Sequence, residues 1–173
     1  MNNFIEKLIS DLHSNEDANV QESLLQTSFI FEKHRGVGAK WDNERQITNL
    51  CWSREVATTH FSPSDVGALK SAVIDYIERN PANENVASGL SALSALTDAT
   101  AKPIFVKALR TYVNTNPATL YQAMIGLDDI GEDVFAGRRS KSITMAEENT
   151  RLAHEYLERQ DKMENDTSEG NPL

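Results

Sequence analysis

Four histidines, one cysteine and several clustered carboxylates are the residues of this 173-residue sequence that could carry chemistry. His154 and Glu158 are four positions apart, so a helix would place both on one face, where they could share a metal ion. No second ligand pair accompanies them, and the sequence has neither an H-E-x-x-H motif nor a paired C-x-x-C motif. The other histidines fall at expected helix ends or turns: His13, His34 and His60. We predict no metal site and no cofactor.

The segment Gly36-Val37-Gly38-Ala39-Lys40 superficially suggests a phosphate-binding loop. Such a loop needs a wider glycine spacing, a preceding strand, and Ser or Thr directly after the lysine. Trp41 follows the lysine instead, so we expect the glycines to end a helix. Cys51 lies on the apolar stripe of its expected helix without an identifiable base to activate it, which favours a buried hydrophobic role. We predict no catalytic residue, with an enzyme of unrecognised type as an alternative.

Two groups of residues are better suited to binding a partner than to catalysis. Residues 128–133 hold four carboxylates in six positions: Asp128, Asp129, Glu132 and Asp133. They lack the alternating ligand spacing of an EF-hand loop, and their mutual repulsion needs relief from a basic partner or from the nearby basic stretch of Arg138, Arg139 and Lys141. Both alternatives stay open.

Trp41, with Asp42 and Glu44, forms the second candidate patch, because an aromatic residue beside acids is a common interface composition. Core packing is the alternative for Trp41, and for Trp52 we expect it.

The composition narrows the class of partner. The formal net charge is −9, with 17 Lys and Arg against 26 Asp and Glu. Nucleic-acid binding depends on basic residues that neutralise phosphates, so we exclude DNA, RNA and an anionic membrane surface as partners and expect a basic protein. Solubility alone is the simpler explanation of the charge. One cysteine fits a reducing compartment, and no apolar run is long enough to span a bilayer. We therefore expect a cytoplasmic protein.

The elements that must position these residues are all expected to be helices, about eight in number, since no stretch alternates with period two. Ser62, Pro63 and Asp65 give the clearest helix start, because they supply an N-cap, a first-turn proline and a capping-box acid. Residues 1–164 are expected to form one helical domain, followed by a disordered polar tail at 165–173. The first helix is expected at about 4–12 with Asn3 as its N-cap. The others are expected at about 20–34, 47–60, 63–79, 84–96, 101–115, 117–130 and 143–163. Their apolar spacing predicts a broad buried face on the second helix that includes Leu25.

A pair of related segments organises the middle of the chain, residues 62–135. Tyr76 and the Asn-Pro-Ala at 80–82 recur at Tyr112 and 116–118, an offset of 36 residues. The same offset pairs apolar positions of the preceding helices: Leu69 with Phe105, Val73 with Leu109 and Ile77 with Val113. In the following helices an offset of 34 pairs Leu90, Leu93 and Leu96 with Met124, Leu127 and Ile130. An offset of 37 instead pairs Gly89-Leu90 with Gly126-Leu127, so two registers stay open there.

This period and apolar spacing resemble HEAT-like repeats, in which helical hairpins stack as an α-solenoid. The resemblance covers two copies and implies a short solenoid; an irregular helical bundle is the alternative. A small acidic helical protein of this kind also looks like the immunity proteins of bacterial contact-dependent or polymorphic toxin systems. That resemblance implies a non-enzymatic inhibitor that covers a basic toxin domain, often a nuclease. The competing hypothesis is a scaffold or adaptor that holds a peptide or helix.

Overall fold

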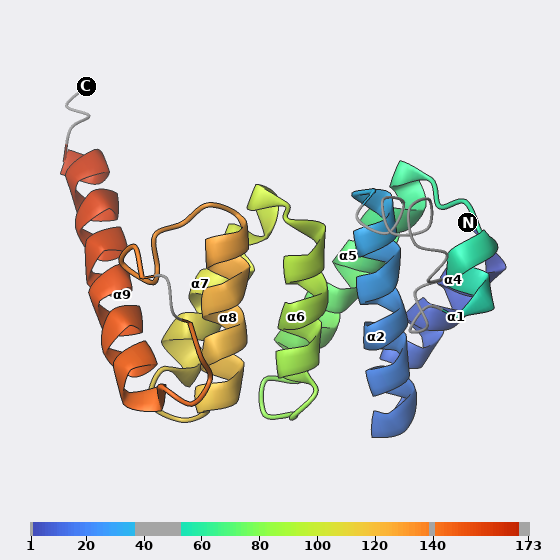
Figure 1. The fold of residues 1–173 in the computed structure, drawn as a ribbon, viewed down its shortest axis with the longest axis horizontal. Coiled ribbons are helices and arrows are strands. Elements are labelled where there is room, and N and C mark those ends of the chain that lie inside the picture. Colours follow the sequence, from blue (N-terminus) through green and yellow to red (C-terminus); the bar gives the residue numbers. More distant parts are fainter. Residues whose placement is uncertain (1, 37–52, 139–140, 170–173) are drawn as a thin grey trace. The chain divides into compact units, whose positions relative to one another are not determined.

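The computed structural model describes residues 2–36, 53–138 and 141–169, and every regular element in these ranges is a helix (Figure 1). The all-α prediction is confirmed. None of the helices in the described ranges combines the length and the apolar character that crossing a membrane requires. The chain divides into two compact units, Met1–Asp98 and Ala99–Leu173, which we describe separately.

Unit 1 is organised around α2 (Asp17–His34), which packs against the other helices of the unit. These are α1 (Asn3–Leu12), α4 (Arg54–Thr58), α5 (Pro63–Arg79) and α6 (Val86–Leu96). The buried face of α2 follows helical spacing through Val20, Leu24 and Ile30. The prediction that Leu25 belongs to this face is wrong: its side chain is 47% exposed, because one step beyond Leu24 turns it away from the core.

Capping residues begin the helices α1 and α5 of unit 1, and a lysine of α2 holds the short helix α4 in place. Ser62 and Asp65 form the predicted capping box at the start of α5. The prediction that Asn3 caps the first helix is wrong by one residue: Asn2 is the cap, because its side chain accepts from the Phe4 amide at 2.8 Å. The five-residue helix α4 is too short to be stable alone. Lys33 fastens it to α2, because its Nζ donates to three carbonyl oxygens at the end of α4: Val56 and Ala57 at 2.7 Å, and Thr59 at 2.9 Å.

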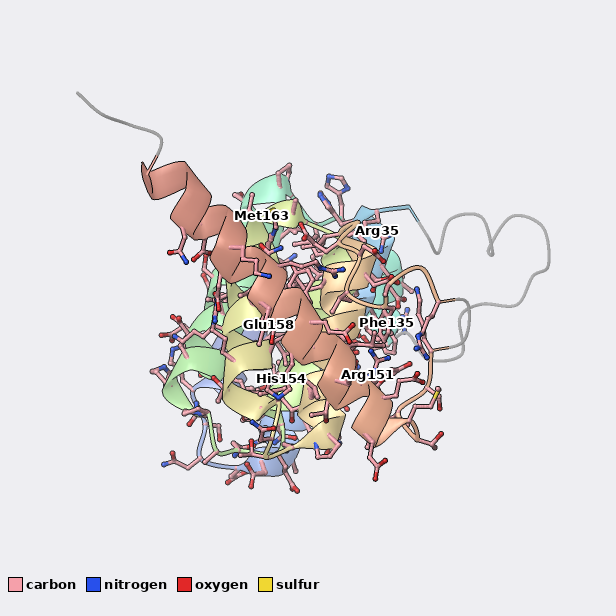
Figure 2. All side chains as sticks on the ribbon, turned by 90° about the vertical axis from the view of Figure 1, so that its left-hand side faces the viewer. Arg35, Phe135, Arg151, His154, Glu158 and Met163 are labelled. Carbon is pink, nitrogen blue, oxygen red and sulfur yellow. The ribbon has the colours of Figure 1, made fainter. Side chains whose placement is uncertain are left out.

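Unit 2 begins with the short 3-10 helix η1 (Ala99–Ala101) and continues into three α-helices. These are α7 (Lys102–Tyr112), α8 (Pro117–Asp129) and α9 (Ala146–Glu169), each of which packs against the other two. Leu152 and Tyr156 anchor the buried face of α9. Figure 2 shows charged and polar side chains along its other side, where Arg151, His154 and Glu158 are exposed.

The hairpins α5–α6 and α7–α8 bury corresponding positions. All three residue pairs predicted at an offset of 36 are buried in both hairpins. In α6 and α8 an offset of 34 pairs three further buried positions: Val86 with Leu120, Leu90 with Met124 and Leu93 with Leu127. An offset of 37 would instead pair buried Ala92 with exposed Asp129. Burial therefore favours the offset of 34.

The turn lengths agree with that register. Six residues, 80–85, separate α5 from α6, whereas four, 113–116, separate α7 from α8. Asn116 caps α8 by accepting from the Thr119 amide at 3.0 Å, and Pro117 takes the first helical position, as the sequence predicts. The turn of the second hairpin is thus two residues shorter than that of the first. This difference explains why the offset is 36 before the turn and 34 after it.

The end of α9 differs from the sequence-based boundary. A polar tail was expected to begin at Asn165, but the helix continues to Glu169. Polar composition indicates exposure to water and does not by itself break a helix, whereas Gly170 is the first strong helix breaker after Met163. Residues 170–173 lie outside the described ranges.

Candidate functional site

The predicted acidic group at 128–133 lies at the end of α8 and in the turn that follows it. Asp128 forms an ion pair with Lys141, and the ammonium group of Lys141 lies 5.2 Å from the centre of the Phe135 ring. Asp129 is exposed on the last turn of α8. Arg138, which the sequence offered as a second internal partner, pairs with Glu148 instead. Lys141 of the expected basic stretch therefore pairs with Asp128, and Arg139 lies outside the described residues.

Glu132 is the most enclosed member of the acidic group. Its carboxylate receives the Lys102 ammonium and the Tyr156 hydroxyl, each at 2.7 Å, so one side chain joins α7 and α9. Partial burial raises the pKa of Glu132, but the Lys102 and Tyr156 hydrogen bonds and the Lys102 charge together lower it below its ordinary value. Burial, followed by the hydrogen bond and charge of Glu132, raises the pKa of the Tyr156 hydroxyl. This arrangement holds unit 2 together, and the carboxylate stays ionised near neutral pH.

Asp133 also makes contacts inside unit 2. Its carboxylate accepts from the Gly137 amide at 2.7 Å, and its carbonyl oxygen accepts from Arg159 at 2.7 Å. The Arg159 guanidinium lies 5.8 Å from the centre of the Tyr156 ring. Asp128, Glu132 and Asp133 thus have partners within their own unit, which supplies the internal relief of repulsion that the sequence left open.

The second predicted patch falls outside the described ranges. Trp41, Asp42 and Glu44 belong to residues 37–52, and so do Cys51 and Trp52. Their proposed roles rest on the sequence alone.

The histidines have isolated polar neighbours. His13 Nε2 lies 3.6 Å from the Asp75 carboxylate, and His154 Nε2 lies 3.3 Å from the Asn114 side-chain oxygen. His154 and Glu158 are both exposed on α9. No group of three His, Cys, Asp or Glu side chains suited to a metal ion occurs among the described residues.

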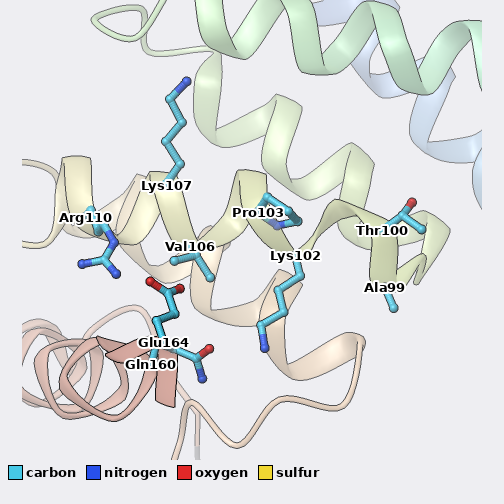
Figure 3. Close-up of a pocket in the computed structure, with 9 residues that line it drawn as sticks. All are labelled: Ala99, Thr100, Lys102, Pro103, Val106, Lys107, Arg110, Gln160 and Glu164. Atoms are coloured by element: carbon cyan, nitrogen blue, oxygen red, sulfur yellow. The ribbon is translucent and has the colours of Figure 1, made fainter. Parts of the chain in front are cut away.

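A groove of about 620 Å³ runs along α7 in unit 2 (Figure 3). Pro103 and Val106 contribute apolar surface, while Lys102 and Arg110 stand beside them on the same helix. Gln160 and Glu164 of α9 line the other side. Arg110 is held by Asp161 of α9 at 2.5 Å, so this cation is already neutralised. Lys107 also lines the groove, so its lining combines three basic side chains and one carboxylate with the apolar surface.

A further acidic surface in unit 1 was not predicted, because it joins residues far apart in the sequence. The turn from α1 to α2 meets the end of α5 and the turn that follows it. The Asn83 side-chain amide donates to the Asp17 carboxylate at 2.9 Å, and the Asn85 side-chain amide donates to the Asp17 carbonyl oxygen at 3.3 Å. We call this surface the acidic end; its carboxylates are Glu16, Asp17, Asp75, Glu78 and Glu84. All five residues are exposed.

Two basic side chains of the acidic end, Arg79 and His13, lie beside Asp75. Asp75 accepts from Arg79 at 2.9 Å and lies near His13. Asp17 and Glu16 are contacted by asparagine side chains, since Asn19 donates to Glu16 at 2.7 Å. Neutral amides satisfy acceptors without compensating charge, so these contacts leave Glu16 and Asp17 negative.

Tyr76 lies beneath the acidic end. The residue is 3% exposed, and its hydroxyl is buried. Burial raises the pKa of this hydroxyl, the charge of Asp17 raises it further, and a side-chain hydrogen bond with Asn85 lowers it. The influence of these two residues places the Tyr76 side chain next to the contacts that fasten α2 to the turn between α5 and α6.

Comparison of the chain with known protein families, with curated proteins and with solved structures gives no significant match. The functional argument therefore rests on the charge and geometry of the chain's own residues. At the acidic end, Asp17 and Glu16 accept from neutral asparagine amides, whereas Asp128 and Glu132 of the predicted group pair with lysines of unit 2.

Proposed function

We propose that this chain is a non-enzymatic, cytoplasmic protein that binds and neutralises a basic protein partner, as an immunity protein does with its cognate toxin domain. The observation that carries this proposal is the distribution of charge. Unit 1 holds 14 acidic against 8 basic residues, a formal charge of −6, and unit 2 holds 12 against 9, a formal charge of −3. An excess of one sign attracts an oppositely charged protein and accelerates its association.

The paired state of the predicted acidic group refines this proposal. Asp128 and Glu132 are engaged by Lys141 and Lys102, so a partner would have to compete with those lysines. At the acidic end, Asp17 and Glu16 accept from neutral asparagine amides. Trp41 with Asp42 and Glu44 stays a proposed second contact from the sequence.

The decisive experiment is co-purification with the product of the neighbouring gene and from a lysate of the source cell. One stoichiometric basic protein that loses a toxic or nuclease activity on binding would support inhibition. Several substoichiometric partners would count against it. The association rate with that basic protein should fall markedly between about 0.05 M and 0.5 M salt, because screening weakens long-range attraction. A rate independent of salt would refute the electrostatic part of the proposal.

A second candidate function is an adaptor that holds a peptide or helix, and the groove of unit 2 favours it. Pro103, Val106 and Arg110 are spaced as i, i+3 and i+7 on α7, which suits contact with a helical segment. A partner that binds as an isolated helical peptide as tightly as in its folded form would favour the adaptor. A partner that binds only when folded would favour the inhibitor.

The HEAT-like architecture of residues 62–135 is also a proposal. Two observations support it: the hairpins α5–α6 and α7–α8 bury corresponding positions, and their turns differ by the two residues that separate the offsets. Because a single helix pair leaves one face uncovered, repeats of this kind gain their core by stacking.

A further inference from the structure

We propose that the groove between α7 and the C-terminal half of α9 holds an acidic amphipathic helix of a protein partner. This inference deepens the second candidate function, the adaptor, and rests on it for the partner being a helix. The groove belongs entirely to unit 2. Its volume of about 620 Å³ is within the range of about 300–1,000 Å³ that is typical of ligand pockets.

The groove exists because the apolar stripe of α9 ends while that of α7 continues. Leu157 is buried, whereas Gln160 and Glu164, on the following turns of α9, are polar and partly or fully exposed. Across from them α7 offers Pro103 and Val106, which are not buried either. A polar wall does not close on an apolar one without losing its water. A segment with one apolar and one polar face fills such a space, and an amphipathic helix has that pattern.

The charge of the α7 wall indicates an acidic occupant. Residues 99–127 contain three basic residues and no acidic one, in a chain whose formal net charge is −9. Lys102, Val106 and Arg110 are spaced four residues apart, so they form one stripe along α7, and Figure 3 shows their side chains on the side that faces α9. The stripe reads cation, apolar, cation, one helical turn apart. A helix with carboxylate, apolar and carboxylate side chains at the same spacing complements it in either direction.

The two cations of this stripe keep donors for a partner although each has an internal ion pair. Asp161 accepts from Arg110 Nη1 at 3.4 Å and from Nη2 at 2.5 Å, whereas a guanidinium has five N–H donors. Glu132 lies 2.7 Å from Lys102 Nζ, and an ammonium group has three donors. A carboxylate of the partner can therefore share each cation with its internal acceptor. A basic helix fits less well, because it would bring its cations against those of α7.

The test is titration of the ¹⁵N-labelled full chain with an alanine- and glutamine-based peptide of about 18 residues, long enough to form a helix. The peptide carries glutamate, leucine and glutamate at four-residue spacing. One comparison peptide has lysines in place of the glutamates, and another has the same composition with these residues on different faces. The acidic peptide should shift backbone amide resonances at residues 99–110 and 160–164, and it should bind at least about fivefold more tightly than either comparison peptide.

Two variants of one ion pair should change the affinity in opposite directions. Arg110→Gln should weaken binding about threefold to fivefold, because it removes a cation that the peptide contacts. Asp161→Asn should strengthen binding about twofold, because it leaves Arg110 in place and removes the carboxylate that competes for it. A purely structural role of this pair would make both variants bind more weakly. Val106→Asp should weaken binding about tenfold, because it places a carboxylate between those of the peptide.

The matched controls are Arg151→Gln and Glu155→Gln, which change the same charges in a similarly exposed ion pair of α9 outside the groove lining. Each should leave the affinity within about twofold. Equal binding of the lysine peptide, shifts that do not include residues 99–110, or weaker binding by Asp161→Asn would each overturn the proposal.

The inference and the proposed functions can fail separately. If the acidic peptide shifts resonances away from α7 and α9, the groove assignment fails, although the adaptor function stands. If the peptide maps to the groove and no basic partner is recovered, the groove stands and the immunity function fails. If a basic toxin domain is neutralised equally by the wild type and by Val106→Asp, inhibition stands on another surface and the groove is decided by the peptide alone.

Discussion

The hairpin α5–α6 of unit 1 and the hairpin α7–α8 of unit 2 end in the same way with different residues. Thr97 follows α6 in a left-handed conformation with φ of 47°, and Gly131 follows α8 with φ of 91°, again at an offset of 34. The next residue in each case is a carboxylate held by a lysine of the hairpin's first helix. Asp98 pairs with Lys70 at 2.6 Å, and Glu132 pairs with Lys102 at 2.7 Å.

The two hairpin ends share a left-handed turn and an ion pair, but they build them from different residues. Lys70 corresponds to Val106 at the offset of 36, so the lysine of the second hairpin stands one helical turn earlier, at position 102. The longer glutamate in place of an aspartate adds reach on the acidic side. A left-handed turn followed by an ion pair back to the first helix therefore recurs even though the residues that build it have changed. The likeness of the two hairpins lies more in geometry than in residue identity.

The largest expected effect comes from the paired core positions Leu93 and Leu127, which are 1% and 0% exposed. Leu93→Ala and Leu127→Ala should each lower the free energy of unfolding by about 2–5 kcal/mol, because both leave a cavity in a closed core. Urea denaturation followed by circular dichroism measures both. A loss near zero for either variant would mean that its hairpin is not packed as described, and would break the correspondence between the two.

Gly89 and Gly126 should respond differently to substitution although a simple alignment pairs them. A Cβ at Gly126 would lie 2.2 Å from the Phe105 ring, whereas one at Gly89 would lie 3.0 Å from Ile77 Cγ1 and 3.2 Å from the Cδ1 at the end of that side chain. Gly126→Ala should cost about 1–3 kcal/mol of stability through overpacking. Gly89→Ala should be within about 1 kcal/mol of neutral, because the gain in helix propensity offsets a mild contact. Thermal denaturation of both variants under one condition tests the difference.

Equal destabilisation by the two alanine variants would support aligning the two hairpins at an offset of 37, in which these glycines occupy equivalent positions. The structure explains why they are not. Gly89 is near the start of α6 and faces the end of α5, whereas Gly126 is near the end of α8 and faces the start of α7. An alignment by residue type pairs the two glycines, but they pack against different parts of their hairpins.

Local signals made much of the helical organisation predictable. The Ser62–Asp65 capping box and the Asn116-Pro117 helix start act within a few residues, and so does the apolar spacing of α5 and α7. Leu25 was misassigned because helical phase changes by 100° at each residue, so a single step along an apolar run leaves the core.

The candidate site depended on contacts that no local pattern contains. Asp17 meets Asn83 across 66 positions, and Glu132 meets Tyr156 across 24. The run of acids at 128–133 was conspicuous in the sequence, yet its charges are largely paired within unit 2. The acidic end is spread over two turns whose individual charge is unremarkable, so only the fold brings it together.

The ion pairs at the two hairpin ends should differ in strength and in pH dependence. Glu132→Gln should cost about 1–2 kcal/mol at pH 7, because it weakens two hydrogen bonds to a partly buried carboxylate. Asp98→Asn should cost less than about 1 kcal/mol, since Asp98 is more exposed. Chemical denaturation at pH 7 compares the two variants.

The sign of the pH effect at Glu132 follows from its lowered pKa. A carboxyl that is more acidic in the folded state stabilises the protein above its unfolded pKa, and that stabilisation is lost as pH falls through the folded value. The gap between the wild type and Glu132→Gln should therefore be constant above about pH 5 and narrow below about pH 4. A gap that widens on acidification would show that the carboxylate is not held as described.

The smallest effect should be a gain in stability at Thr97. A β-branched residue at φ of 47° is strained, whereas glycine adopts this conformation freely, as Gly131 does at the matching position. Thr97→Gly should therefore raise the free energy of unfolding by about 0.5–1 kcal/mol, even though it removes side-chain atoms. The reverse change, Gly131→Thr, should lower stability by about 1–2 kcal/mol, because it introduces at the second hairpin the strain that the first one carries. Opposite signs for the two variants would establish that the left-handed turn is a shared requirement of both hairpins, and a loss of stability in both would show that Thr97 makes contacts that outweigh its backbone strain.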